Sequence, residues 1–93
     1  MSTIGPATAT TASVASSATN VTLWAAAGGT RGRAVFNDST AVLYLKYGAT
    51  ASTSSFTVQI ASNGYYEFPQ PTYVGQVDGI WAAANGNARL TSW

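Results

Sequence analysis

Few side chains of this 93-residue chain could take part in chemistry. It carries four basic and three acidic residues, and it has no histidine and no cysteine. Without histidine, a serine or threonine nucleophile lacks its usual general base, and without cysteine there is no thiolate. Histidine and cysteine are also the common zinc ligands. The composition therefore predicts no catalytic residue, no metal site and no cofactor, and it argues against an enzyme.

One carboxylate pair is the remaining catalytic candidate. Glu67 and Asp78 could serve as the acid and base of a glycosidase, which needs two carboxyl groups about 5–9.5 Å apart. The simpler interpretation is that Glu67 faces solvent from a strand and Asp78 begins a turn. We favour that interpretation, because so few charges leave nothing nearby to tune either pKa.

A glycine-rich loop carries two of the three arginines. Residues 28–33 read GGTRGR, which suggests a phosphate-binding loop. The Lys-Ser/Thr ending is missing and no helix is expected to follow, so we favour another interpretation. We interpret the segment as a mobile loop in which Arg31 and Arg33 contact a partner protein, because the planar guanidinium makes paired hydrogen bonds.

The aromatic residues offer two functional interpretations. The eight tryptophans and tyrosines exceed what one small core needs. Trp24 and Trp93 are candidate anchors in protein contacts, where Trp, Tyr and Arg are enriched. Alternatively, Tyr65, Tyr66 and Trp81 form stacking platforms for glycans. The third possibility is that the rings fill a core otherwise built of small residues.

The elements that must position these residues are predicted to be strands. In the clearest strand, Leu43, Leu45 and Tyr47 share one face, and we expect that face to be buried. Turns are expected at residues 37–40 and at Asp78-Gly79, and hairpins at Asn63-Gly64 and Asn85-Gly86. The predicted strands cover residues 21–24, 34–36, 42–47, 56–60, 65–68, 73–77, 80–83 and 88–93. Their spacing predicts an all-β fold, a small antiparallel β-sandwich or barrel.

The N-terminal segment has a different composition. Residues 1–13 are rich in Ser, Thr and Ala and contain Gly5-Pro6, so they cannot bury enough apolar surface to order themselves. We expect a flexible arm at 1–13 and a single domain at 14–93. The arm would order on a neighbour by adding a strand to a sheet edge, with Thr3, Ile4, Pro6 and Ser13 as contact residues.

The charge pattern favours adhesion to other proteins. Charged residues make up 8% of the chain and the net charge is +1, against about 25% charged residues in a typical soluble domain. So weak a positive field excludes nucleic acid as a partner. No segment resembles a secretory signal or approaches a membrane span, so we expect synthesis in a cytoplasm and no membrane contact.

Three sequence pieces carry a family resemblance. They are Asn37-Asp38-Ser39, the run from Gly64 to Glu67 (GYYE), and the run from Asp78 to Trp81 (DGIW). Over about residues 14–91 the chain resembles small virion structural proteins of tailed bacteriophages and prophages. The loops at 25–33 and 69–72 depart from that group.

The resemblance implies a small all-β protein of the head or tail. The first expectation is a capsid decoration protein on the capsid exterior, made in the bacterial host cytoplasm. It would bind the major capsid protein and other copies of itself, in a small symmetric group such as a homotrimer. The alternative is an accessory head or tail module that binds host-surface glycans through exposed aromatic rings.

Overall fold

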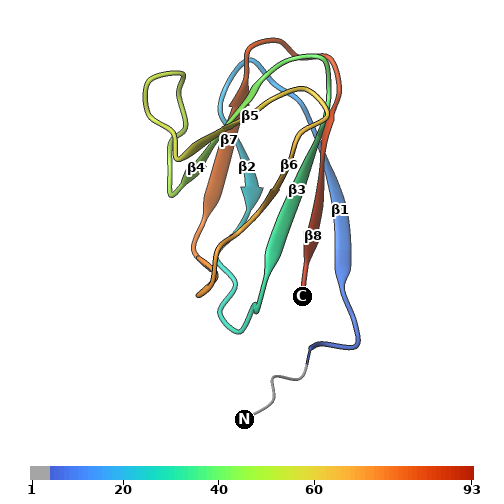
Figure 1. Ribbon diagram of the computed structural model, residues 1–93. Coiled ribbons are helices and arrows are strands. Elements are labelled where there is room, and N and C mark those ends of the chain that lie inside the picture. The colour runs from blue at the N-terminus through green and yellow to red at the C-terminus, as the bar shows by residue number, and fades with distance from the viewer. Residues whose placement is uncertain (1–4) are drawn as a thin grey trace.

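Eight β-strands and no helix make up the part of the chain that the computed structural model describes, residues 5–93. Four strands form each of two sheets, which face one another (Figure 1). Sheet A has the order β1-β8-β3-β6 and sheet B the order β2-β7-β4-β5. The strands are β1 (Thr10–Ala15), β2 (Val21–Trp24), β3 (Arg33–Asp38), β4 (Leu43–Tyr47), β5 (Val58–Ile60), β6 (Tyr65–Glu67), β7 (Val77–Trp81) and β8 (Asn87–Ser92). The predicted all-β sandwich is confirmed.

The strand order is that of a jelly roll. The first strand pairs with the last, β1 with β8, and the pairing continues inward through β2–β7, β3–β6 and β4–β5, always antiparallel. Such a pattern arises when one long hairpin wraps into two sheets, each of them antiparallel. Only β4 and β5 are both consecutive in sequence and neighbours in one sheet. Each of the other six connections between consecutive strands crosses from one sheet to the other.

The core lies between the sheets and follows the two-residue period of the strands. Leu43 and Leu45 of β4 have no exposed surface, which confirms the predicted buried face. Val35 of β3 and Val77 of β7 are equally buried. Each such side chain contributes about 1.5–3 kcal/mol relative to an exposed position. Gly79 also faces this core, where an added Cβ would lie 3.0 Å from both Leu23 and Leu43.

The predicted turn at Asp78-Gly79 is wrong, and the turn predicted at residues 37–40 is confirmed only at Ser39 and Thr40, where the chain bends after β3. Asn37 and Asp38 continue β3, and Asp78-Gly79 lies inside β7. The predicted strand at 73–77 is irregular before Val77. Polar and glycine residues at these positions resemble turn residues, but the strands here are held by long-range pairing.

The two predicted Asn-Gly hairpins are also wrong. Asn63-Gly64 joins β5 to β6, and Asn85-Gly86 joins β7 to β8, yet each of these connections crosses between the sheets. Asn63 does adopt a left-handed conformation, with φ 61°. The local turn chemistry was thus recognised correctly at that position, but a turn does not decide in which sheet the next strand lies.

The boundary between the predicted arm and the domain needs a correction. β1 begins at Thr10, so residues 10–13 belong to the folded sandwich, where they pair with β8. Thr3 and Ile4 lie outside the described residues. Gly5 to Ala9 are exposed and precede β1 at the end of the molecule where the C-terminus lies (Figure 1).

Residues 5–93 include no helix of the length and apolar character needed to cross a membrane.

Candidate protein-contact surface

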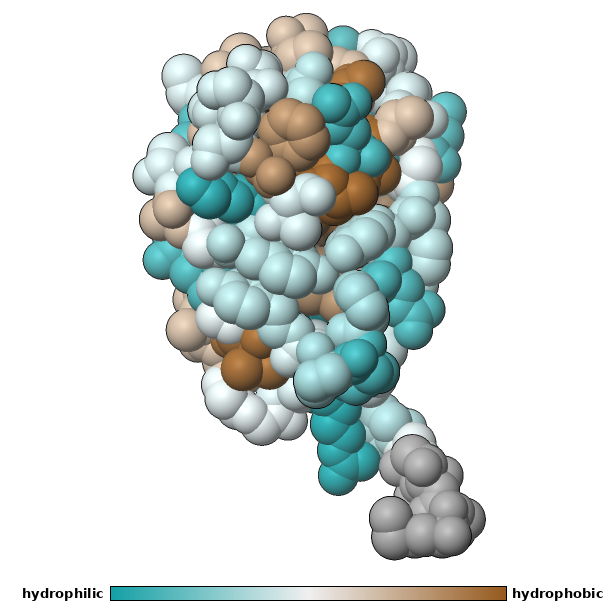
Figure 2. Space-filling view, turned by 60° about the vertical axis from the view of Figure 1, so that its left-hand side comes forward, coloured by the Kyte–Doolittle hydropathy of each residue, from teal (hydrophilic) through white to brown (hydrophobic). Residues whose placement is uncertain are grey.

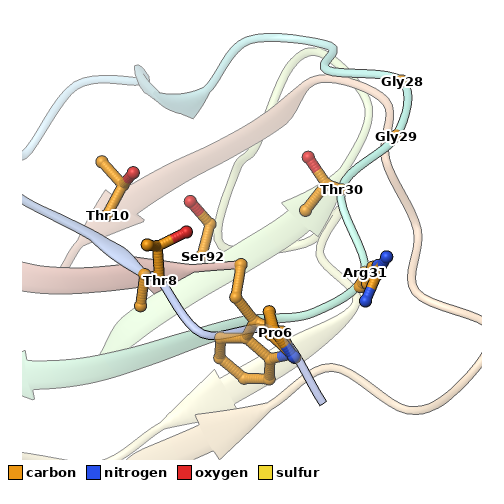
Figure 3. A pocket seen from close by; sticks show the side chains of 10 residues that line it. Pro6, Thr8, Thr10, Gly28, Gly29, Thr30, Arg31 and Ser92 are labelled. Atoms are coloured by element: carbon orange, nitrogen blue, oxygen red, sulfur yellow. The ribbon is translucent and has the colours of Figure 1, made fainter. Parts of the chain in front are cut away.

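Two adjoining pockets open at one end of the sandwich. They share four residues, Pro6, Thr30, Arg31 and Trp93, which we call the end surface. Three of the four, Pro6, Arg31 and Trp93, are predicted protein contacts. Figure 3 shows the side chains of Pro6 and Arg31 at the same hollow, although they come from distant parts of the sequence. The fold therefore brings together three separately predicted contact residues.

Backbone pairing fixes the position of Trp93. Its carbonyl oxygen accepts hydrogen bonds from the N–H groups of Arg31 (2.6 Å) and Gly32 (3.1 Å), and its N–H donates to the Gly32 carbonyl (3.0 Å). The indole ring lies directly over Gly32, where a Cβ atom would overlap it. Glycine at position 32 is thus required by the close approach of the ring.

The Arg31 backbone is held on its other side as well. Its carbonyl oxygen accepts hydrogen bonds from Gln70 Nε2 and Thr72 Oγ1, each at 2.8 Å. The Arg31 side chain is exposed, and its guanidinium makes no hydrogen bond to another described residue. A rigid backbone with a free guanidinium suits a partner's carboxylate or backbone carbonyl.

Arg33 has a different role from the one predicted. It has no exposed surface, and it donates to the carbonyl oxygens of Tyr73 (2.9 Å), Gly75 (2.8 Å) and Ala25 (3.1 Å). Its guanidinium also lies 5.3 Å from the centre of the Trp24 ring. Burial lowers the pKa of Arg33, and the charge of Tyr73 acts in the opposite direction. Arg33 is therefore not a partner contact; it fastens the loops after β2 and before β7.

A cluster of aromatic rings fills the same end of the core. Phe68 makes an edge contact with Trp24 (5.2 Å between ring centres) and stacks on Tyr47 (5.0 Å), which stacks in turn on Tyr73 (4.7 Å). The Tyr47 and Tyr66 hydroxyl groups are hydrogen bonded at 2.9 Å. Burial, and secondly this bond, raise the pKa of Tyr47 well above its usual value. Trp24 is half-buried here and does not line the end pockets, so its predicted contact role has no support from this geometry.

The predicted glycan platform does not form. Trp81 is 1% exposed, and its Nε1–H donates to the side chain of Asn37 at 3.0 Å. Tyr66 belongs to the aromatic cluster, where it contacts Phe68. Tyr65 is exposed, at 63%, but stands without the other two rings. The three rings thus present no common surface to a sugar.

The carboxylate pair is also separated by the fold. Glu67 is exposed on β6 in sheet A, whereas Asp78 is 1% exposed on β7 in sheet B. Both carboxylate oxygens of Asp78 accept hydrogen bonds from amide side chains, Asn20 at 3.0 Å and Gln76 at 2.9 Å. Asp78 is therefore a buried structural residue, not the start of a turn, and the two carboxylates do not share a cleft.

A buried polar network was missed from the sequence. The Asn37 amide donates to the carbonyl oxygens of Ala41 and Ile60, both at 2.8 Å, and its oxygen accepts from Ser39 and Trp81. The alternation of side chains along a strand could have predicted it. Arg33 and Asn37 each lie two residues from the apolar Val35, so all three side chains lie on the same face of β3, which is the face toward the core.

Ser13, the last predicted contact, lies on β1 away from the end surface. Its Oγ accepts a hydrogen bond from Arg89 Nη1 at 2.8 Å, and Arg89 also pairs with Asp38 at 3.0 Å.

Within residues 5–93, no cluster of three or more Asp or Glu side chains could hold a metal ion. Comparisons of the chain with protein-family models, with curated proteins and with solved structures found no match.

Proposed function

We propose that this protein is a structural component of a tailed-phage virion, a decoration protein that binds the major capsid protein on the outside of the shell. The single observation that carries the proposal is the end surface. Arg31 and Trp93 belong to residue types that are enriched in binding hot spots, and they lie beside Pro6 at one solvent-facing site. The role proposed is adhesion, with no catalytic step.

Surface composition supports the same role. On the face shown in Figure 2, intermediate colours predominate, and the strongly hydrophobic patches are small and separate. Arg33 and Asp78 are buried and Arg89 pairs with Asp38, which leaves little charge to repel a protein neighbour. A surface of this kind loses little hydration on docking, and many copies on one particle add their weak contacts through multivalency.

The fold and the resemblance agree with this proposal. Jelly rolls occur in viral capsid proteins and in lectins, so the fold alone is compatible with both candidate functions. The sequence resemblance to phage virion proteins favours the first. The glycan-binding alternative depended on several coplanar exposed rings, and only Tyr65 among its three residues is exposed.

Capsid binding by an Arg31→Glu variant tests the proposal. Reversing this charge changes an exposed side chain and leaves the backbone contacts of Arg31 in place. Hot-spot truncations cost about 2 kcal/mol or more, so we expect at least a tenfold weaker association when labelled protein is sedimented with particles that lack it. Ser54→Glu, in the loop between β4 and β5 well away from the C-terminus (Figure 1), is the control for added negative charge.

Two results would overturn the proposal. One is equal sedimentation of Arg31→Glu and Ser54→Glu with the particles. The other is a particle that resists heat and low salt equally well with and without the protein. A density map of the intact particle would then locate the protein, and a position inside the shell would also contradict a decoration role.

A further inference from the structure

The outer edge of β1 has unused hydrogen-bonding groups. β1 is the terminal strand of sheet A and pairs on one side with β8, in a register in which Thr10 faces Ser92 and Ala15 faces Asn87. No other described strand pairs with its second side. The strand reads TTASVA. It has no charge, proline or bulge, the devices that usually keep an edge strand from pairing with another chain.

The register identifies the residues that face this open edge. In continuation of the ladder, Ser16 N–H donates to the Gly86 carbonyl at 2.9 Å. Hydrogen-bonded pairs alternate along an antiparallel ladder, so Thr10, Ala12 and Val14 bond to β8. Thr11, Ser13 and Ala15 therefore direct their N–H and C=O groups away from the sheet.

The other side of β8 gives the same alternation. Trp93 exchanges both backbone hydrogen bonds with Gly32 of the segment that leads into β3. Odd-numbered residues of β8 thus face β3, and even-numbered residues face β1. The assignment of Thr11, Ser13 and Ala15 to the free edge therefore rests on two independent sets of bonds.

We propose that β1 pairs with β1 of a second copy, antiparallel, about a two-fold axis through Ser13. This register places Ser13 opposite Ser13 and Thr11 opposite Ala15 of the other copy, so each outward donor of one edge meets an acceptor of the other. The β1 side chains brought together are small and uncharged. The cation beside the axis, Arg89, donates to Ser13 Oγ in each copy, and its ion pair with Asp38 offsets its repulsion from the Arg89 of the other copy. A two-fold axis makes the same patch serve both copies.

The segment before β1 also suits a second copy as the occupant. In this register, residues 8 and 9 of one copy run alongside residues 17 and 18 of the other, and both segments are largely exposed here. Sheet A of each copy would join into one continuous sheet across the axis. The pairing is a property of the isolated chain, so it does not depend on the proposed capsid role, and it replaces the expected three-fold group with a two-fold one.

A single-cysteine variant tests the pairing, because the chain has no cysteine of its own. Directly opposed residues of a hydrogen-bonded pair have Cα atoms about 5.5 Å apart, within the range a disulfide spans. Ser13→Cys should therefore form a covalent dimer in oxidised glutathione at least tenfold faster than Ser54→Cys, whose loop lies away from β1. The wild-type chain has a mass of 9.6 kDa. Its average molar mass, measured by light scattering, should rise from that of one chain toward that of two chains as the protein concentration is increased.

A proline variant separates edge pairing from folding. Ser13→Pro removes an N–H that points away from β8, so the intramolecular ladder is kept and the dimer should weaken at least tenfold. Ser13→Ala removes only the bond from Arg89 and should remain dimeric. The proposal fails if wild type is monomeric at millimolar concentration, if the two cysteine variants cross-link equally, or if Ser13→Pro dimerises as strongly as wild type.

Discussion

Replacement of Arg33 by methionine tests whether this buried cation fastens the loops after β2 and before β7. Arg33 has no exposed surface, and it holds three carbonyl oxygens of two loops at 2.8–3.1 Å. Methionine fills much of the volume but leaves those carbonyls without their donor. The exposed Arg31, two residues earlier, is the matched control because it is the same residue type in the same segment.

The expected loss is large relative to the total stability. A domain of this size has about 5–14 kcal/mol of stability at roughly 0.05–0.15 kcal/mol per residue. Hydrogen bonds to a charged donor contribute about 1.5–3 kcal/mol each, partly offset here by removing the cost of burying the cation. We therefore expect Arg33→Met to lose about 3 kcal/mol and Arg31→Met less than about 0.5 kcal/mol.

Urea unfolding measures both variants. With a slope of about 1 kcal/mol per molar for a small domain, the midpoint of Arg33→Met should fall by about 3 M. Arg33→Lys keeps the charge but loses the planar fork, so an intermediate loss of about 1–2 kcal/mol is expected even if the methionine variant does not fold. A loss below about 1 kcal/mol for Arg33→Met, or equal losses at positions 31 and 33, would refute the argument.

Three further predictions follow from the buried contacts. Tyr47 has a pKa raised in the folded state above its unfolded value of about 10, so its contribution to stability is complete below pH 10 and is lost as the pH rises further. Thermal melts of Tyr47→Phe should show a shallower decline above pH 10 than wild type, and an unchanged slope would contradict burial of the hydroxyl. Asn37→Asp aims a carboxylate at buried carbonyl oxygens and should cost at least about 2 kcal/mol in urea unfolding at neutral pH; a neutral effect would argue against the network. Gly32→Ala should displace the Trp93 indole, with a loss of about 1–3 kcal/mol and altered tryptophan fluorescence. Gly28→Ala, where a Cβ meets nothing within 4 Å, should change neither quantity, and matching results for the two glycines would refute the close packing.

Local sequence pattern determined most of the strands and the buried face of β4, but it missed β1, which was predicted to be part of a flexible arm, and it placed a strand at 73–77 where the chain is irregular before Val77. Alternation at Leu43 and Leu45 predicted their burial, because the side-chain period of two is a property of the strand itself. The same pattern predicted no helix, and residues 5–93 contain none. Among the contact candidates, Pro6, Arg31 and Trp93 were named individually, but nothing local indicated that they meet.

Tertiary structure decided the sheet of each strand and the roles of the polar residues. Asn63-Gly64 makes a turn in any fold, yet the long-range pairing of β6 with β3 places the next strand in the opposite sheet. Arg31 and Arg33 are the same residue type. Arg33 is buried because it is the first residue of β3, whereas Arg31 precedes the strand and is exposed. Burial and pairing depend on segments far apart in the chain, and their contacts exist only after the two sheets have packed together.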